Sequence, residues 1–123
     1  MQNYWSSSSI FCGRKYIAGT IINIISTAAK KIFTNSTAYT SSKMGLLGYT
    51  NVLREEIRKD NIRIINVIPG ATETPMWPMD VRNEKSERMM SSDEVAQVLV
   101  WLYLQKGNMV TEEITLRPIE GDL

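Results

Sequence analysis

The sequence contains no histidine, which removes the commonest side chain for acid/base catalysis and for zinc binding. Catalysis by a histidine, or a metal site that uses one, is therefore excluded. The single cysteine, Cys12, rules out an internal disulfide and is consistent with a reducing compartment. A net charge of +1 gives no reason to expect nucleic acid or an acidic membrane as a partner.

Long apolar runs are also missing, since none approaches the ~20 residues of a membrane span. Four serines at residues 6–9 interrupt any apolar core of a signal peptide. We therefore expect a cytoplasmic protein with no membrane partner. The seven glycines do not form the G-x-G-x-x-G pattern of a phosphate-binding loop after a strand.

The chain does contain a strand–helix–strand pattern between Thr20 and Gly70. Two apolar, β-branched runs at residues 20–25 and 63–68 flank a helical pattern from about residue 37 to about residue 59. Both runs are apolar at nearly every position, as is typical of strands that are covered on both faces. The pattern predicts a βαβ unit with parallel strands. At 123 residues, the chain is expected to be a single domain.

The remaining elements are predicted around this unit. Residues 71–90 contain prolines, methionines and a tryptophan without periodicity, which indicates an ordered loop of lid length. Ser91 and Glu94 form a capping box before a helix at residues 93–106, which is apolar nearly all round and should be buried on more than one side. Residues 110–117 alternate as a strand of the same sheet. Residues 1–18 show neither helical nor strand periodicity and are expected to be irregular.

The long helix has two features with structural explanations. Its charged end, residues 54–60, is predicted to be a solvated face. Gly45 and Gly48 weaken helix propensity, but their small size would permit a close approach by another helix or a sheet.

Polar residues gather beyond the carboxyl ends of the predicted strands, where ligands bind in such sheets. Ser26 ends the first strand, Tyr39 and Lys43 open the helix, and Pro69-Gly70 ends the second strand. Tyr39 and Lys43 are four residues apart and share one helix face. An ammonium beside a phenol favours the phenolate, so such a tyrosine can exchange a proton with a carbonyl or hydroxyl oxygen. Ser26 can hydrogen-bond the same oxygen.

Taken alone, the spacing of Tyr39 and Lys43 is a weak signal, because such pairs usually lie on a helix surface. The serine thirteen residues before Tyr39 sharpens it, as does a Pro69-Gly70 followed by Thr72 and Thr74. Together these residues resemble the short-chain dehydrogenase/reductase family. The resemblance covers roughly residues 19–116 and only the C-terminal half of that family's fold.

The resemblance implies an α/β fold, a partial Rossmann-like (doubly wound) parallel sheet with a βαβ unit and a further helix and strand. It implies oxidoreduction of a small-molecule alcohol/carbonyl pair, with catalytic roles for Ser26, Tyr39 and Lys43. The cofactor would be NAD or NADP, bound by Tyr39, Lys43, Pro69, Gly70, Thr72 and Thr74. The substrate pocket would be lined by Ser26, Met76 and Trp77, with apolar surface added by Met89 and Met90.

The family's nucleotide-binding half is not in this sequence, so we expect a truncated chain with weak cofactor binding. Residues 20–25 would then form a strand with an open apolar edge. The expected partner is a complementing N-terminal half, or another copy in a homo-dimer or tetramer formed through the tyrosine-bearing helix. An inactive fragment and a non-enzymatic α/β interaction module remain as alternatives.

Overall fold

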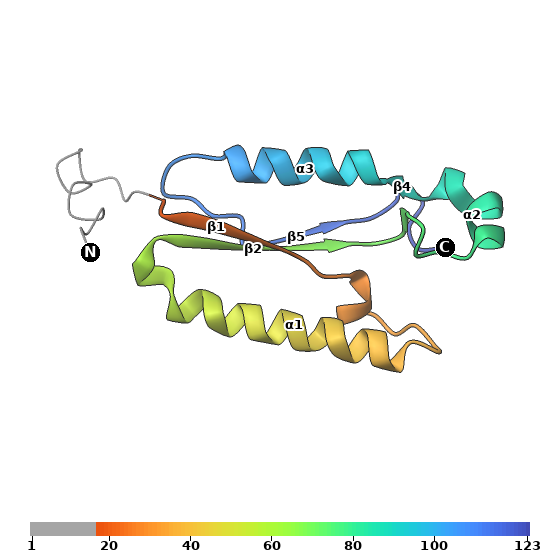
Figure 1. The fold of residues 1–123 in the computed structure, drawn as a ribbon, viewed down its shortest axis with the longest axis horizontal. Coiled ribbons are helices and arrows are strands. Elements are labelled where there is room, and N and C mark those ends of the chain that lie inside the picture. Colours follow the sequence, from red (N-terminus) through yellow and green to blue (C-terminus); the bar gives the residue numbers. More distant parts are fainter. Residues whose placement is uncertain (1–16) are drawn as a thin grey trace.

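The computed structural model describes residues 17–123. The irregular segment predicted at residues 1–18 therefore lies almost wholly outside the described residues, as does Cys12. The described part has three layers, with helices α1 (Thr37–Glu56) and α3 (Ser92–Leu104) on opposite faces of one sheet (Figure 1). This arrangement confirms the predicted α/β fold class.

Three strands form the central sheet in the order β1-β2-β5, and both neighbouring pairs are parallel. The strands span Gly19–Ile24, Ile62–Pro69 and Glu113–Leu116. The predicted βαβ unit is thus confirmed as β1, α1 and β2. The last strand is shorter than the alternating run at residues 110–117, because only its final residues pair with β2.

Strand β2 is the centre of the core, and side chains from its two faces meet different helices. Ile68 packs with Ile25 and with the inner face of α1. Ile65 and Val67 pack with Leu102 of α3 on the other face. The near-continuous apolar run of β2 is explained by this double burial.

Strand β1 differs from the expectation that both strands are covered on both faces. It is an edge strand of the sheet, and Ile21 and Ile24 are each 42% exposed. These two side chains point to opposite faces, because residues three apart in a strand lie on different sides. The predicted open apolar edge is confirmed.

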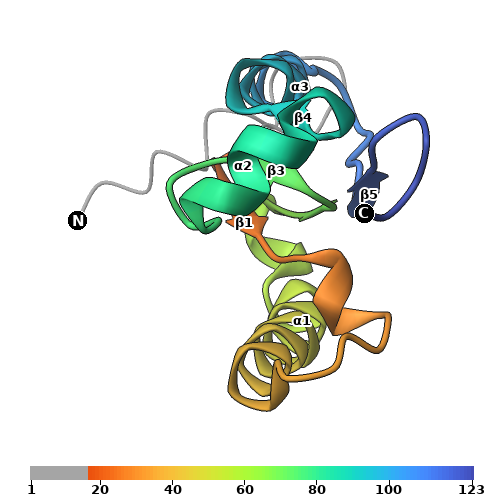
Figure 2. The ribbon, with the colours of Figure 1, turned by 90° about the vertical axis from the view of Figure 1, so that its right-hand side faces the viewer.

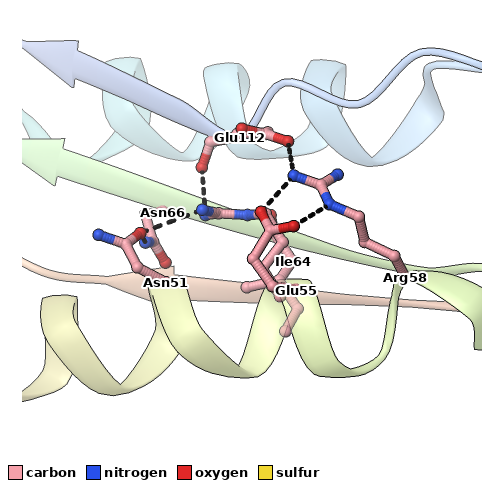
Figure 3. A network of polar contacts seen from close by, with 7 residues as sticks. Asn51, Glu55, Arg58, Ile64, Asn66 and Glu112 are labelled. Atoms are coloured by element: carbon pink, nitrogen blue, oxygen red, sulfur yellow. Dashed lines mark hydrogen bonds and ion pairs between the residues drawn. The ribbon is translucent and has the colours of Figure 1, made fainter.

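The charged end of α1 is not simply a solvated face, because Arg54 is buried there. Its guanidinium donates to the carbonyl oxygens of Ile64 and Glu112 and to Oδ1 of Asn51, at 2.8–3.1 Å. Figure 3 shows this network with the neighbouring Arg58, whose guanidinium is paired with Glu55 and with the carboxylate of Glu112. Sequence charge alone could not reveal the burial, which depends on the strand lying beneath that turn.

Helix α3 begins with the predicted capping box, in which Ser91 and Glu94 each accept from the other's backbone N–H. The expected burial on several sides is wrong, because only one side packs on the sheet through Val95 and Leu102. The outward side chains Val100, Trp101, Tyr103 and Leu104 are all more than half exposed. No helix within residues 17–123 is long and apolar enough to cross a membrane.

Residues 71–91 contain more regular structure than the predicted loop. Strands β3 (Thr72–Glu73) and β4 (Met90–Ser91) form a small parallel sheet, and helix α2 (Met79–Lys85) lies between them. These elements have only two to seven residues, too few to produce a detectable period. Their pairing joins residues far apart in sequence, so local pattern gives no sign of it.

Candidate active site

The carboxyl ends of the three parallel strands lie at one edge of the sheet, which we call the carboxyl edge. It is on the right in Figure 1 and faces the viewer in Figure 2. The start of α1, helix α2, the small β3–β4 sheet and the C-terminus all lie at this edge. Ligands bind at this position in open parallel sheets.

Ser26 follows β1 at the carboxyl edge and starts a 3-10 turn over Thr27–Ala29. Its Oγ accepts a hydrogen bond from the backbone N–H of Ala28 at 3.1 Å, which fixes the side chain. Because the oxygen accepts this bond, the hydroxyl hydrogen can still be donated to another group. The position matches the strand-end serine predicted from sequence.

Tyr39 and Lys43 lie in the first turns of α1, on the face directed toward β1. The Lys43 Nζ is 5.7 Å from the centre of the Tyr39 ring. It also donates to the carbonyl oxygen of Ile24, the last residue of β1, at 3.2 Å. This bond ties the helix to the strand that carries Ser26, so the amine lies next to both the phenol and the strand end.

Within residues 17–123, no hydrogen bond joins Ser26 to Tyr39 or to Lys43. The structure thus brings Tyr39 and Lys43 together and places Ser26 on the segment that Lys43 contacts. Tyr39 is 37% exposed, so its hydroxyl is reachable from solvent. An acid/base tyrosine needs such access, because it must meet the oxygen of a substrate.

Pro69, Gly70, Thr72 and Thr74 follow one another out of β2 along the same edge. The N–H of Gly70 donates to the carbonyl oxygen of Leu116 at 2.7 Å, which joins this turn to the end of β5. The hydroxyl of Thr72 donates to the Gly70 carbonyl at 3.1 Å, and Thr74 accepts from the N–H of Met76 at 3.4 Å. These bonds give the segment a defined path rather than that of a loose loop.

The two side chains predicted to line a substrate pocket are placed differently. The Trp77 indole N–H donates to the carbonyl oxygen of Thr72 at 2.9 Å, and the ring is half-buried. Met76 is 74% exposed, whereas Met89 is buried. Trp77 is therefore anchored beside Thr72, and Met76 projects away from the packed part of this segment.

Two hollows lie near the carboxyl edge, and neither is lined by Ser26, Tyr39 or Lys43. The larger, about 610 Å³, lies between the start of α3 and the residues that follow β5. The smaller, about 370 Å³, lies between residues 28–33 and the outer side of the first turns of α1. The predicted catalytic residues therefore line neither of these two hollows.

Sequence reasoning missed a chain of three hydrogen-bonded amides beneath this site, of which Asn66 is the buried one. Asn23 of β1 donates to Oδ1 of Asn66, which is fully buried in β2, and Asn66 donates to Oδ1 of Asn51 on α1. These bonds join β1, which Ser26 follows, to α1, which carries Tyr39 and Lys43, through the central strand β2. The signal in the sequence was the presence of Asn23 and Asn66 inside otherwise apolar strand runs. A buried amide needs hydrogen-bond partners, so an asparagine in such a run indicates a polar contact.

The ammonium and hydroxyl groups at this edge could hold a polar cofactor. No group of three or more His, Cys, Asp or Glu side chains in the described part of the chain could hold a metal ion. The contacts found for the Lys43 ammonium use one of its three hydrogens. Two hydrogens can therefore be offered to the hydroxyl or phosphate oxygens of a nucleotide, alongside the hydroxyls of Tyr39 and Thr74.

Curated proteins similar to this chain include named reductases. A sepiapterin reductase of Chlorobaculum tepidum is 43% identical over 106 residues, which are 86% of this chain and 43% of that protein. A 3-oxoacyl-(acyl-carrier-protein) reductase of Chlamydia pneumoniae is 30% identical over 129 residues, which are 98% of this chain and 51% of that protein. The chain therefore spans about half or less of the length of these relatives.

Solved structures of longer chains contain the same arrangement. A serine dehydrogenase from Escherichia coli matches with a TM-score of 0.69 at 16% identity, over 85% of this chain and 42% of that one. BdcA in complex with NADPH matches with a TM-score of 0.68 at 24% identity, over 85% of this chain and 46% of that one. At these identities the matches establish the fold.

The family model described as short chain dehydrogenase matches residues 9–85, which are more than half of the chain. The matched region includes β1, α1 and β2 with the residues at their carboxyl ends. From this match, and from the 43% identity over most of the chain, we conclude that this protein belongs to the short-chain dehydrogenase family.

Proposed function

We propose that this chain is the catalytic half of an NAD(P)-dependent oxidoreductase that acts on a small-molecule alcohol/carbonyl pair. The observation that carries the proposal is the position of Lys43, whose Nζ is bonded to the end of β1 and lies 5.7 Å from the Tyr39 ring centre. Family membership and the reductase names of two relatives support the reaction class.

Tyr39 is the proposed acid/base. Its exposed hydroxyl gives a proton to a carbonyl oxygen during reduction and takes one from a hydroxyl during oxidation. Lys43 is the cation beside the Tyr39 ring, at 5.7 Å from its centre. Ser26 donates its free hydroxyl hydrogen to the same substrate oxygen, and its bond from Ala28 N–H keeps the side chain in place.

When bound, a nicotinamide cofactor supplies the hydride, which no side chain can provide. Lys43 and Tyr39 would hold the ribose next to the nicotinamide. Pro69, Gly70, Thr72 and Thr74 would line the nicotinamide and its neighbouring phosphates. We assign two apolar side chains of the same segment, Trp77 and the buried Met89, to the substrate pocket.

Strong cofactor binding should need a second polypeptide segment. The chain spans about half or less of its relatives' length, and β1 has an open edge with Ile21 and Ile24 exposed on its two faces. We propose that a nucleotide-binding half pairs with this edge. A second copy of the chain is the partner proposed for the outer face of α1, where Gly45 and Gly48 have open space around them.

The test is a titration of the chain with NADPH and with NADH, followed by nicotinamide fluorescence, alone and with the N-terminal half of a relative. The proposal expects weak binding by the chain alone and tighter binding in the mixture, with carbonyl reduction only in the mixture. Binding without any turnover would indicate an inactive fragment. No binding under either condition would support a non-enzymatic interaction module instead.

A further inference from the structure

The residues that follow β5 fold back across the carboxyl edge and end beside the candidate site. A turn closed by the Gly121 N–H and the Pro118 carbonyl, 2.9 Å apart, reverses the chain, and Gly121 has a φ of +86°. Pro118 is buried against Gly70, where a β-carbon would meet the proline ring at 3.4 Å. The tail, residues 117–123, is therefore packed against the proposed cofactor segment.

Asp122 is the residue of this tail with the most partners. Its Oδ2 accepts from Nζ of Lys31 at 2.7 Å and from the Arg117 guanidinium at 3.0 Å. Its backbone carbonyl oxygen accepts from Nη2 of Arg88 at 2.9 Å. The carboxylate is 29% exposed, so water screens these contacts less than it screens an open surface pair.

The three cations come from three different segments of the carboxyl edge. Lys31 lies five residues after Ser26, directly beyond the 3-10 turn that Ser26 starts. Arg88 lies just before β4, at the end of the segment that begins at Gly70. Arg117 directly follows β5. One short tail thus contacts both segments that border the candidate site.

We propose that Asp122 is a positioning residue, which fastens the Ser26–Lys31 segment and the Arg88 segment to each other across the carboxyl edge. The tail acts as a clasp, because its carboxylate holds the first segment and its carbonyl holds the second. The fastening itself is independent of the proposed reaction. Its effect on catalysis rests on the proposed function.

The chemistry of the contacts supports a fastening role. A single exposed ion pair contributes little, but one carboxylate that is shared by two cations forms a small network. The bonds from Lys31 and then Arg117 lower the pKa of Asp122, so the carboxylate is charged at neutral pH. Glu120 adds a contact of 3.2 Å to Arg88, which brings the same cation to the tail from a second side.

Hydrogen exchange of the full chain tests the clasp at defined amides. Those of Lys31 and Met90 are bonded to Thr27 and Ala71 and report on the two segments. Asp122→Asn should raise exchange at both amides on the order of three- to tenfold. Asp60→Asn, the same change at an exposed residue before β2, should leave both unchanged. Unchanged exchange at Lys31 and Met90 in Asp122→Asn would overturn the proposal.

A second variant separates the clasp from a general loss of structure. Lys31→Gln removes one contact but leaves the tail held by the Arg117–Asp122 pair and bonded to Arg88, so exchange should rise at the amide of residue 31 and much less at Met90. Asp122→Glu keeps the charge and should restore protection at both amides. Equal increases throughout the sheet in Asp122→Asn would mean that the residue only stabilises the fold, which contradicts the positioning role.

The catalytic consequence is measured in the mixture with a complementing half. Asp122→Asn should raise KM for the carbonyl substrate severalfold with a smaller change in kcat, because Asp122 is away from the reacting atoms. An unchanged KM would refute this consequence. If the mixture has no activity at all, the proposed function fails while the exchange result still decides the clasp.

Discussion

Arg54 shows how one buried charge is satisfied by neutral groups. Its guanidinium has three acceptors within 3.1 Å, two of them backbone carbonyls and the third an amide oxygen. The side chain joins α1 to β2 and to the residue before β5. Because Ile64 is buried with the guanidinium, removing the donor would leave a buried carbonyl oxygen without this partner.

Arg54→Ala should therefore lower the free energy of unfolding by about 2–3 kcal/mol, the cost of losing buried bonds to a charged group. The measurement is urea unfolding followed by circular dichroism. Arg58→Ala is the matched control, because Arg58 lies four residues on and is paired only with exposed carboxylates. Equal losses of unfolding free energy in the two variants would show that the buried contacts of Arg54 contribute no more than the exposed ion pairs of Arg58.

Tyr39→Phe tests the proposed acid/base with the smallest possible change. Loss of the hydroxyl should reduce turnover in the complemented enzyme about 10²- to 10⁴-fold, the usual contribution of a positioned acid/base. Tyr49→Phe is the control, because Tyr49 is on the same helix and is 65% exposed on its outer face. If Tyr39→Phe keeps full activity while Tyr49→Phe does the same, the assignment of Tyr39 is wrong.

At the scale of elements, the start of α3 offers a direct stability test. Ser91→Ala removes the side-chain half of the capping box and should lower the free energy of unfolding by about 1 kcal/mol. Ser92→Ala is the control, because Ser92 is exposed and is the first residue inside the helix. Thermal unfolding measures both, and a Ser92→Ala loss as large as that of Ser91→Ala would contradict the cap.

The same cap has a pH dependence with a definite sign. The backbone N–H of Ser91 lowers the pKa of Glu94 below its usual value. The stabilisation is therefore complete above the pKa of the unfolded chain and is lost as the pH falls through the lower folded value. Glu94→Gln, which cannot ionise, should lie closest to wild type in stability at acid pH, which unfolding at pH 3 and pH 7 would measure.

Long elements could be predicted from sequence, and short ones could not. α1, α3 and β2 have periods or apolar runs that extend over many residues, so their type and approximate bounds were confirmed. β3 and β4 owe their form to pairing between residues eighteen apart, such as Thr72 with Met90. Local sequence has no information on such pairing.

The candidate site was predictable in position because its residues are fixed by local rules. Ser26 follows an apolar run, and Tyr39 and Lys43 share a helix face by spacing alone. The tail contacts of Asp122 were not predictable, because they depend on three segments that meet only in the folded chain. The catalytic roles of Ser26, Tyr39 and Lys43 stay predictions.

At the scale of the whole molecule, apolar surface is left open on both sides of β1. An exposed strand edge with apolar side chains can pair with another chain, and this liability is countered by lysine on the edge. Ile21 lies in the middle of β1 and Ile24 at its end, each 42% exposed. The outer side of α3 adds further apolar surface. The isolated chain should therefore associate with itself at high concentration.

Ile21→Lys should reduce this association without unfolding the chain, because a charge at the edge opposes pairing while the side chain can extend into solvent. Sedimentation velocity over a concentration series measures the change. Ile32→Lys is the control, since Ile32 is 96% exposed but lies in the loop after β1 rather than on the edge. Equal effects of the two variants would indicate that net charge, not the strand edge, governs association. A reduction confined to Ile21→Lys would identify β1 as the surface that a complementing half must cover.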